Sequence, residues 1–234
     1  MSVDAKATEP GRLAPGVAAT LAAAEIPLSK LGPNRHARLA PAERELYVWI
    51  LRQFATDGRP SSTQMLAAAA RLAIDAEDAL ETLAREDLVH RGAHDEITVA
   101  YPFSGRPTAH RVRFPGGHLV EAMCAIDALG VASMFGEPIE IESRDPVSRA
   151  EIRARVAPDG DAEWWPGSAV VVTGAIRHQG DACCGCCPVV NFFASSANAE
   201  HWLAEHPEVR GNVISIRDAA AAGRAVFSDV LSES

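Results

Sequence analysis

Apolar residues recur at helical spacing through the first half of the chain. The segment that begins at Pro41 and closes at Gly58 predicts a helix whose apolar face is formed by Leu46, Trp49, Ile50 and Phe54. Two more helical patterns cover residues 61–74 and 75–91, and an alternating run at 96–103 predicts a strand. Three helices followed by a β-ribbon indicate a winged-helix-like arrangement.

The pattern changes after Phe103, where the apolar segments become shorter and alternate. Residues 118–135 predict one helix that ends near Gly130, and a later helix is predicted from an N-cap at Asn198 to His206. The predicted strands lie at 109–114, 138–143, 150–157, 168–176 and 212–216, and a last helix covers 218–231. This half therefore predicts an α+β domain with a mixed or antiparallel sheet.

These changes divide the chain into three parts. Residues 1–15 mix Ala, Pro, Gly and charge without periodicity, which predicts a loosely ordered tail. Residues 16–103 are expected to form the helical, winged-helix-like domain, and residues 104–234 the α+β domain. The predicted fold class is α+β.

Composition and charge narrow the possible functions. The 234 residues carry a formal net charge of −9, which argues against nucleic acid or an anionic membrane surface as a partner. The sequence holds no apolar run near the ~20 residues that a membrane helix needs, and its start lacks the apolar stretch of a signal peptide. We therefore expect a cytoplasmic protein with no membrane partner.

The winged-helix outline raises the alternative of DNA binding. The stretch from Asp75 to Asp87, where a recognition helix would lie, contains six acidic residues and Arg85 as its single base. Such a helix would be repelled by phosphates. A helical module that packs on the rest of the protein is the better interpretation.

The cysteines are distributed unevenly. Four of the five fall within five positions, Cys183, Cys184, Cys186 and Cys187, and the fifth, Cys124, lies three positions before Asp127 in a predicted helix. Adjacent cysteines fit disulfide geometry poorly and their number is odd, so reduced thiols are expected. Clustered thiolates suit a soft metal ion or sulfur chemistry, and a thiol beside a carboxyl can exchange a proton with it. The eight histidines are scattered, which indicates ordinary surface or core roles.

Two other interpretations of the cysteines are open. In one, they are small buried hydrophobes. In the other, the protein binds a metal without catalysis, and the C-x-x-C pairs Cys183/Cys186 and Cys184/Cys187 hold zinc, copper(I) or mercury. Tetrahedral Cys₄ zinc sites usually join two such pairs across a longer loop, so the crowding disfavours this second interpretation.

Both cysteine contexts together resemble the organomercurial (alkylmercury) lyase family. The resemblance rests on MCAIDALG at 123–130 and on CCPVVNFFASSANAEHWLAEHPEVRGNVISIRDA at 186–219, and it covers most of residues 95–231. The acidic helical module upstream is similar to the helical N-terminal domain of that family. The resemblance implies that residues 104–234 form a lyase catalytic domain.

The implied reaction is protonolysis of a carbon–mercury bond. Two thiolates bind the mercury of an organomercurial such as methylmercury, and an aspartic acid passes a proton to the leaving carbon, giving a hydrocarbon and thiolate-bound Hg(II). By position, Cys124 is implied as the first thiol, Asp127 as the proton shuttle and Cys187 as the second thiol. An apolar pocket would raise the pKa of the carboxyl so that it carries this proton near neutral pH. No organic cofactor is implied, and small thiols or a mercuric reductase are expected to accept the Hg(II).

The sequence departs from the family pattern at three places. Four cysteines precede Phe192 where the family has one or two, so Cys186 or Cys184 is an alternative second thiol, and all five cysteines are candidate mercury ligands. Asn191 stands where the family often has His, and Ala122 and Met123 stand where aromatic residues are common. These differences motivate one more hypothesis, a lyase fold that acts on another carbon–heteroatom bond.

Overall fold

The computed structural model describes residues 15–26, 34, 36–176 and 186–232, and the predicted tail at 1–15 lies almost entirely outside this part of the chain. The described residues form antiparallel sheets together with helices, so the fold class is α+β. The helices are α1 (Pro15–Ala23), α2 (Pro41–Thr56), α3 (Ser62–Arg71), α4 (Ala76–Arg85), α5 (Ala125–Phe135), α7 (Ser196–Glu205) and α8 (Ile216–Phe227). The strands are β1 (Val89–Arg91), β2 (Ile97–Ala100), β3 (Phe103–Ser104), β4 (His110–Arg113), β5 (Leu119–Ala122), β6 (Ile139–Arg144), β7 (Glu151–Val156), β8 (Ala162–Trp165), β9 (Val170–Ile176), β10 (Asn191–Phe193) and β11 (Val209–Ser215).

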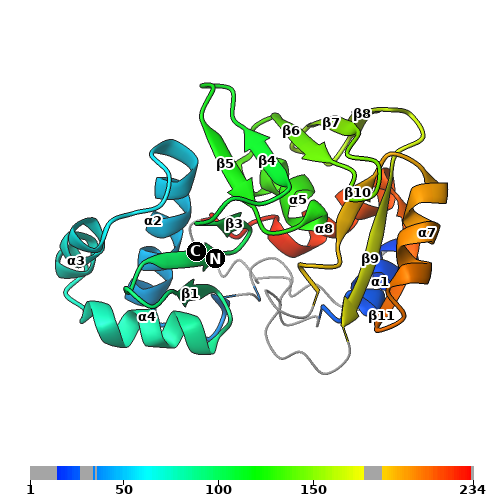
Figure 1. Cartoon of the computed structure of the whole chain (residues 1–234). Helices are drawn as coiled ribbons and strands as arrows, with labels where there is room; N and C mark the ends of the chain where they lie inside the picture. The colour runs from blue at the N-terminus through cyan, green and yellow to red at the C-terminus, as the bar shows by residue number, and fades with distance from the viewer. Residues whose placement is uncertain (1–14, 27–33, 35, 177–185, 233–234) are drawn as a thin grey trace.

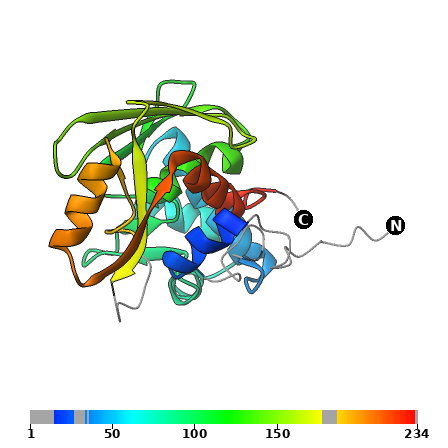
Figure 2. The ribbon, with the colours of Figure 1, turned by 90° about the vertical axis from the view of Figure 1, so that its right-hand side faces the viewer.

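Two antiparallel sheets frame the molecule. The larger sheet has the strand order β1-β2-β3-β5-β4-β6-β7-β8, and the smaller has the order β10-β9-β11. Figure 1 shows α2, α3 and α4 beside β1 at one end, and α7 with the smaller sheet at the other. Helices α5 and α8 lie between these two ends (Figure 1), and α1 packs against α8, as the turned view in Figure 2 also shows.

The first half of the chain follows its predicted pattern closely. Helix α2 begins at Pro41 in the first turn and ends at Thr56, and its apolar face buries Leu46, Ile50 and Phe54. The pattern over 61–74 gives α3, which ends at Arg71. The pattern over 75–91 gives α4 only as far as Arg85, because the last residues turn into β1 and pair with β2.

The predicted helix at 118–135 is wrong at both ends. Residues 119–122 form β5, which pairs with β4 in a hairpin around the turn at Gly117, where φ is +84°. Helix α5 begins only after Cys124 and continues past Gly130 to Phe135, with Gly136 as its left-handed C-cap. The helix is apolar on every side and is almost completely buried, so its sequence shows no polar face that would mark its limits.

Gly130 allows a close helix–helix approach and does not end the helix. A Cβ at this position would lie 2.8 Å from the carbonyl oxygen of Gly223 on α8, and a Cβ on Gly223 would lie 2.6 Å from the carbonyl oxygen of Ile126. The two glycines therefore let the backbones of α5 and α8 pack directly on each other. This contact fixes the helix whose first turn carries Asp127.

The predicted N-cap of α7 is also corrected. Helix α7 begins after Ser195, whose hydroxyl accepts the backbone N–H of Asn198 at 3.2 Å. The side chain of Asn198 instead donates to the buried carboxylate of Asp145 at 2.7 Å. Asp145 also accepts the backbone N–H groups of Val147, Ser148 and Ala194, so one carboxylate joins the end of β6 to the start of α7.

Candidate active site

Cys124 occupies the N-cap of α5, at the junction with β5. Its backbone is extended, with φ −154° and ψ 178°, and its Sγ accepts the backbone N–H of Asp127 at 3.4 Å. Sulfur here replaces the oxygen that usually caps a helix. The sequence placed Cys124 inside the helix. At the cap position Cys124 still lies beside Asp127, because its sulfur accepts the backbone N–H of that residue.

The second sulfur comes from a turn that precedes β10. The backbone N–H groups of Val189 and Val190 both donate to the carbonyl of Cys186, at 2.9 and 3.0 Å. The carbonyl of Val190 in turn accepts the backbone N–H of Ala125 at 3.0 Å. The turn that carries Cys187 is therefore hydrogen-bonded to the first residue of α5.

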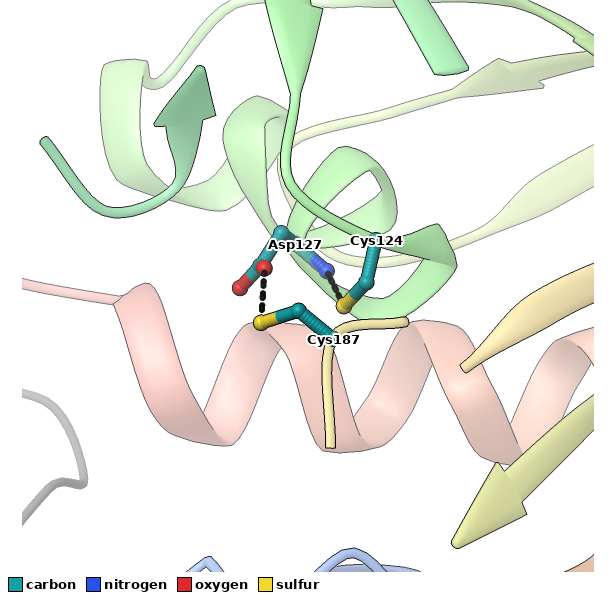
Figure 3. A group of neighbouring side chains, drawn as sticks. All are labelled: Cys124, Asp127 and Cys187. Atoms are coloured by element: carbon teal, nitrogen blue, oxygen red, sulfur yellow. Dashed lines mark hydrogen bonds between the residues drawn. The ribbon is translucent and has the colours of Figure 1, made fainter. Parts of the chain in front are cut away.

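These two elements bring Cys124, Asp127 and Cys187 together. One ligand atom of each lies within 4.8 Å of those of the other two, and Cys187 Sγ donates to Asp127 Oδ2 at 3.7 Å. Figure 3 shows the two sulfurs and the carboxylate facing one another. The three residues are only 4 to 7% exposed. Such a group of two thiols and one carboxyl can bind a soft metal and move a proton at the same place.

Burial keeps protons on the thiols. Loss of solvation raises the pKa of the Cys124 thiol to about 12, an effect only partly offset by its hydrogen bond with Cys187. The pKa of the Cys187 thiol is raised well above its ordinary value, first by its hydrogen bonds to Cys124 and Cys186 and then by burial. Both thiols are thus proton carriers near neutral pH until a soft metal displaces the protons.

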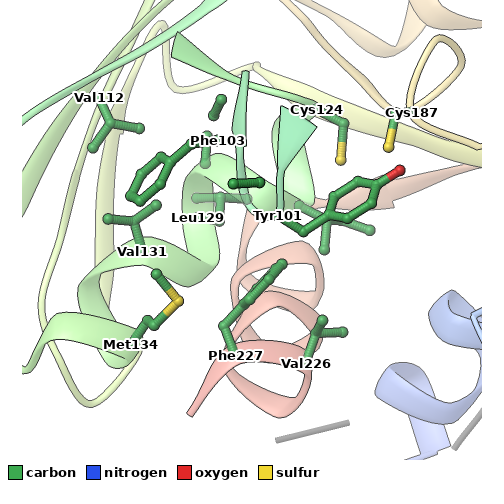
Figure 4. Packing of buried hydrophobic residues seen from close by; sticks show 14 of the residues in the cluster. Tyr101, Phe103, Val112, Cys124, Leu129, Val131, Met134, Cys187, Val226 and Phe227 are labelled. Atoms are coloured by element: carbon green, nitrogen blue, oxygen red, sulfur yellow. The ribbon is translucent and has the colours of Figure 1, made fainter. Parts of the chain in front are cut away.

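The surroundings of the two sulfurs are apolar. Cys124 and Cys187 belong to the same buried cluster as Tyr101, Leu129 and Phe227, and Figure 4 shows both thiols projecting at the edge of this core. An apolar lining strengthens electrostatic interactions because it excludes water.

Of the three other cysteines, one lies within the described residues. Cys186 is described, is 8% exposed and lies beside Cys187. Cys183 and Cys184 lie outside the described residues.

Sequence reasoning missed a polar chain beside the site. His110 on β4 is 2% exposed, and its ring nitrogens contact Ser143 Oγ at 2.9 Å and Asn191 Oδ1 at 3.1 Å. Burial lowers the pKa of His110 to about 4. The available signal was the alternation of β4, because His110 shares the inward face with Val112.

None of the helices in the described part of the chain is long and apolar enough to cross a membrane.

The fold and the site define a class of α+β protein with a buried centre of two thiols and a carboxyl. A sequence model of the alkylmercury lyase family, MerB, matches residues 103–228, more than half of the chain. The chain is 28% identical over 180 residues to the alkylmercury lyase of Staphylococcus epidermidis, which covers 75% of this chain and 80% of that protein. It is 35% identical over 118 residues to the alkylmercury lyase of Bacillus cereus, which covers 50% of this chain and 53% of that protein.

The fold has a solved counterpart. A crystal structure described as the mercury-bound form of MerB2 superposes with a TM-score of 0.67 at 22% identity, covering 85% of this chain and 95% of that one. The chain belongs to the alkylmercury lyase family.

Proposed function

We propose that this protein is a carbon–mercury lyase in which Cys124, Cys187 and Asp127 carry out the protonolysis. The observation that carries the proposal is the buried meeting of two thiols and one carboxyl within 4.8 Å of one another in a chain of this family. The substrate is a small organomercurial, R–Hg–X, in which X is an exchangeable ligand.

The first step is capture of the mercury by one thiol. Mercury is a soft metal, and a thiolate donates electron density to it far better than an oxygen ligand does. The sulfur of Cys124 bonds to mercury and displaces X, and the proton of this thiol leaves with X as HX. The sulfur of Cys187 then bonds to the mercury while its proton passes along its hydrogen bond to Oδ2 of Asp127.

The second step is cleavage of the carbon–mercury bond. The electron pair of that bond becomes the new carbon–hydrogen bond, and the proton comes from the carboxyl of Asp127. The products are R–H and Hg(II) held by the sulfurs of Cys124 and Cys187. Mercury stays in its +2 state throughout, so the reaction needs no external oxidant or reductant and no organic cofactor.

Release of mercury needs other thiols. A dithiolate complex of Hg(II) is stable, so exchange with small thiols, or with the cysteines of a mercuric reductase, is the proposed route of product release. Cys183, Cys184 and Cys186 are proposed as additional thiols that pass Hg(II) outward; Cys186, beside Cys187, supports the idea. An active site of free thiols also fits a cytoplasmic location, where thiols stay reduced.

The proposal also includes a division of the chain into two domains. Residues 16–103 are proposed to be a winged-helix-like domain that packs on the catalytic domain of residues 104–234 and does not bind DNA. The contact between Nε2 of His118 and the carbonyl of Phe54 on α2, at 3.0 Å, joins the two parts and supports a packing role. The acidic side chains at the start of α4 oppose binding to phosphates.

The test uses the purified, reduced protein with phenylmercury or methylmercury and an excess of small thiol. We expect release of benzene or methane that is lost in C124A, C187A and D127A. Stoichiometric uptake of mercury without release of hydrocarbon would show a sequestering protein and would contradict the proposal.

A further inference from the structure

We infer that Asn191 is a positioning residue for this reaction, because it links a buried hydrogen-bonded pair, Ser143 and His110, to the turn that carries Cys187. The inference rests on the proposed function, since it concerns how the second thiol is placed. It adds to the site three residues that do not touch the sulfurs.

The chain joins three separate segments. His110 on β4 and Ser143 on β6 are direct partners across the larger sheet, and His110 Nδ1 lies 2.9 Å from Ser143 Oγ. On the other side of the ring, Nε2 lies 3.1 Å from Oδ1 of Asn191, the first residue of β10. Asn191 Nδ2 then donates to the carbonyl of Pro188 at 2.8 Å. Pro188 follows Cys187 directly in the sequence.

The carbonyl of Pro188, at the end of the chain, determines which group donates in each of these hydrogen bonds. The Pro188 carbonyl can only accept, so Asn191 must turn its amide nitrogen to it and its oxygen to His110. The imidazole must then carry its proton on Nε2 and accept the hydroxyl proton of Ser143 at Nδ1. Burial keeps this ring neutral at physiological pH, since it lowers the pKa of His110 to about 4.

The ring is held by packing as well as by hydrogen bonds. Phe192 contacts the imidazole edge-on, with ring centroids 5.6 Å apart and planes at 65°. His110 and Ser143 are 2% and 3% exposed. The sheet end of the chain is therefore held in place by packing, and Asn191 joins it to the carbonyl of Pro188, the residue after Cys187.

Placement of this thiol matters because the reaction needs two sulfurs and one carboxyl at a single mercury atom. A displacement of about 1 Å in a catalytic group can lower a rate by about 10²-fold. The bond between Ala125 N–H and the Val190 carbonyl fixes the far end of the turn, and the bond from Asn191 fixes the end next to Cys187. Loss of the second bond frees the sulfur without removing any reacting group.

The test compares N191L with N198L. Both substitutions remove a side-chain amide of the same size, but Asn198 is bonded to Asp145 and Ser148 at the start of α7 and not to the thiol turn. Single-turnover release of benzene from phenylmercury is measured together with the affinity for phenylmercury. We expect N191L to lose at least tenfold in rate while its affinity stays within threefold, because capture by Cys124 is unaffected. N198L is expected to keep its rate within twofold.

A rate for N191L within twofold of the wild type, or an equal loss in N198L, would overturn the inference. A second readout does not depend on turnover: competition of inorganic Hg(II) between the protein and a small dithiol. N191L is expected to hold Hg(II) at least tenfold more weakly than N198L, and equal retention by the two variants contradicts the inference. If the wild type released no hydrocarbon, the proposed function would fail while this comparison still decided the role of Asn191.

The unsubstituted protein gives a third readout if N191L does not fold. The ¹⁵N resonances of His110 are expected to show a neutral ring protonated at Nε2 near pH 7. A neutral ring protonated at Nδ1 leaves no donor between His110 and Oδ1 of Asn191, and this result overturns the inference.

Discussion

The backbone N–H of Ala125 donates to the carbonyl of Val190 at 3.0 Å, and this bond ties the two segments that carry the sulfurs. Cys124 comes just before the first partner, and Cys187 comes three residues before the second. The thiols are therefore paired through main-chain geometry before any metal arrives. Catalytic groups placed by backbone bonds need little reorganisation when the substrate binds.

The proton-transfer role of Asp127 gives the first prediction. D127N keeps the shape of the side chain but cannot accept the proton of Cys187 and return it to carbon. We expect hydrocarbon release to fall by about 10²–10⁴-fold, the usual contribution of a positioned acid–base group. Binding of the organomercurial, followed by mercury retained after gel filtration, is expected to persist. Full activity of D127N would contradict the proposed proton path.

The contact between α5 and α8 gives the second prediction. In G130A the new methyl group would meet the carbonyl of Gly223 at 2.8 Å and the ring of Phe227 at 2.5 Å. Overpacking of this kind costs about 1–3 kcal/mol in the free energy of unfolding, measured by urea denaturation. G116A is the control, because nothing lies within 4 Å of a Cβ at that position. An equal stability of the two variants would show that the helices do not approach this closely.

The buried imidazole of His110 gives the third prediction. Its pKa is lowered from 6.5 to about 4 in the folded protein, so the unfolded chain binds more protons between these two values. The free energy of unfolding must therefore fall as pH drops from about 6.5 toward 4, by about 3 kcal/mol in total from this group. H110Q is expected to flatten this part of the pH profile, whereas H201Q, with its exposed side chain, should keep the wild-type slope. A profile for H110Q that parallels the wild type would contradict the account.

The carboxylate of Asp145 gives the fourth prediction. It is fully buried and accepts bonds from Val147, Ser148, Ala194 and Asn198. D145A leaves these donors unpaired, and we expect a loss of about 3 kcal/mol or more in the free energy of unfolding. D159A is the control, since Asp159 accepts only a local, exposed bond from Asp161 among those described for its side chain. Equal thermal shifts in the two variants would show that Asp145 has no such role.

The sequence predicted helices and strands most accurately where one face of the element is polar. Helix α2 shows its apolar stripe and its start at Pro41, and both are confirmed. The limits of α5 were missed because the helix is buried all round, and its Gly130 was mistaken for a stop when it serves contact with Gly223. The strand β5 was hidden because it runs into the helix with only two residues between them.

The candidate site was accessible to sequence reasoning only in part. Cys124, Asp127 and Cys187 could be selected because thiols and carboxyls are chemically distinctive at those positions. The chain through His110 and Asn191 could not, because its members are 81 residues apart and each is ordinary by itself. Only tertiary packing places such residues side by side.

The sulfur of Cys124 stands where the unpaired N–H groups of α5 converge, which is the electropositive pole of the helix. Burial makes this thiol difficult to ionise while no metal is bound. Any negative charge on its sulfur, however, faces the positive end of the helix dipole. When mercury replaces the proton of this thiol, the helix dipole therefore stabilises the negative charge that develops on the sulfur, and no side chain has to be ordered for this purpose.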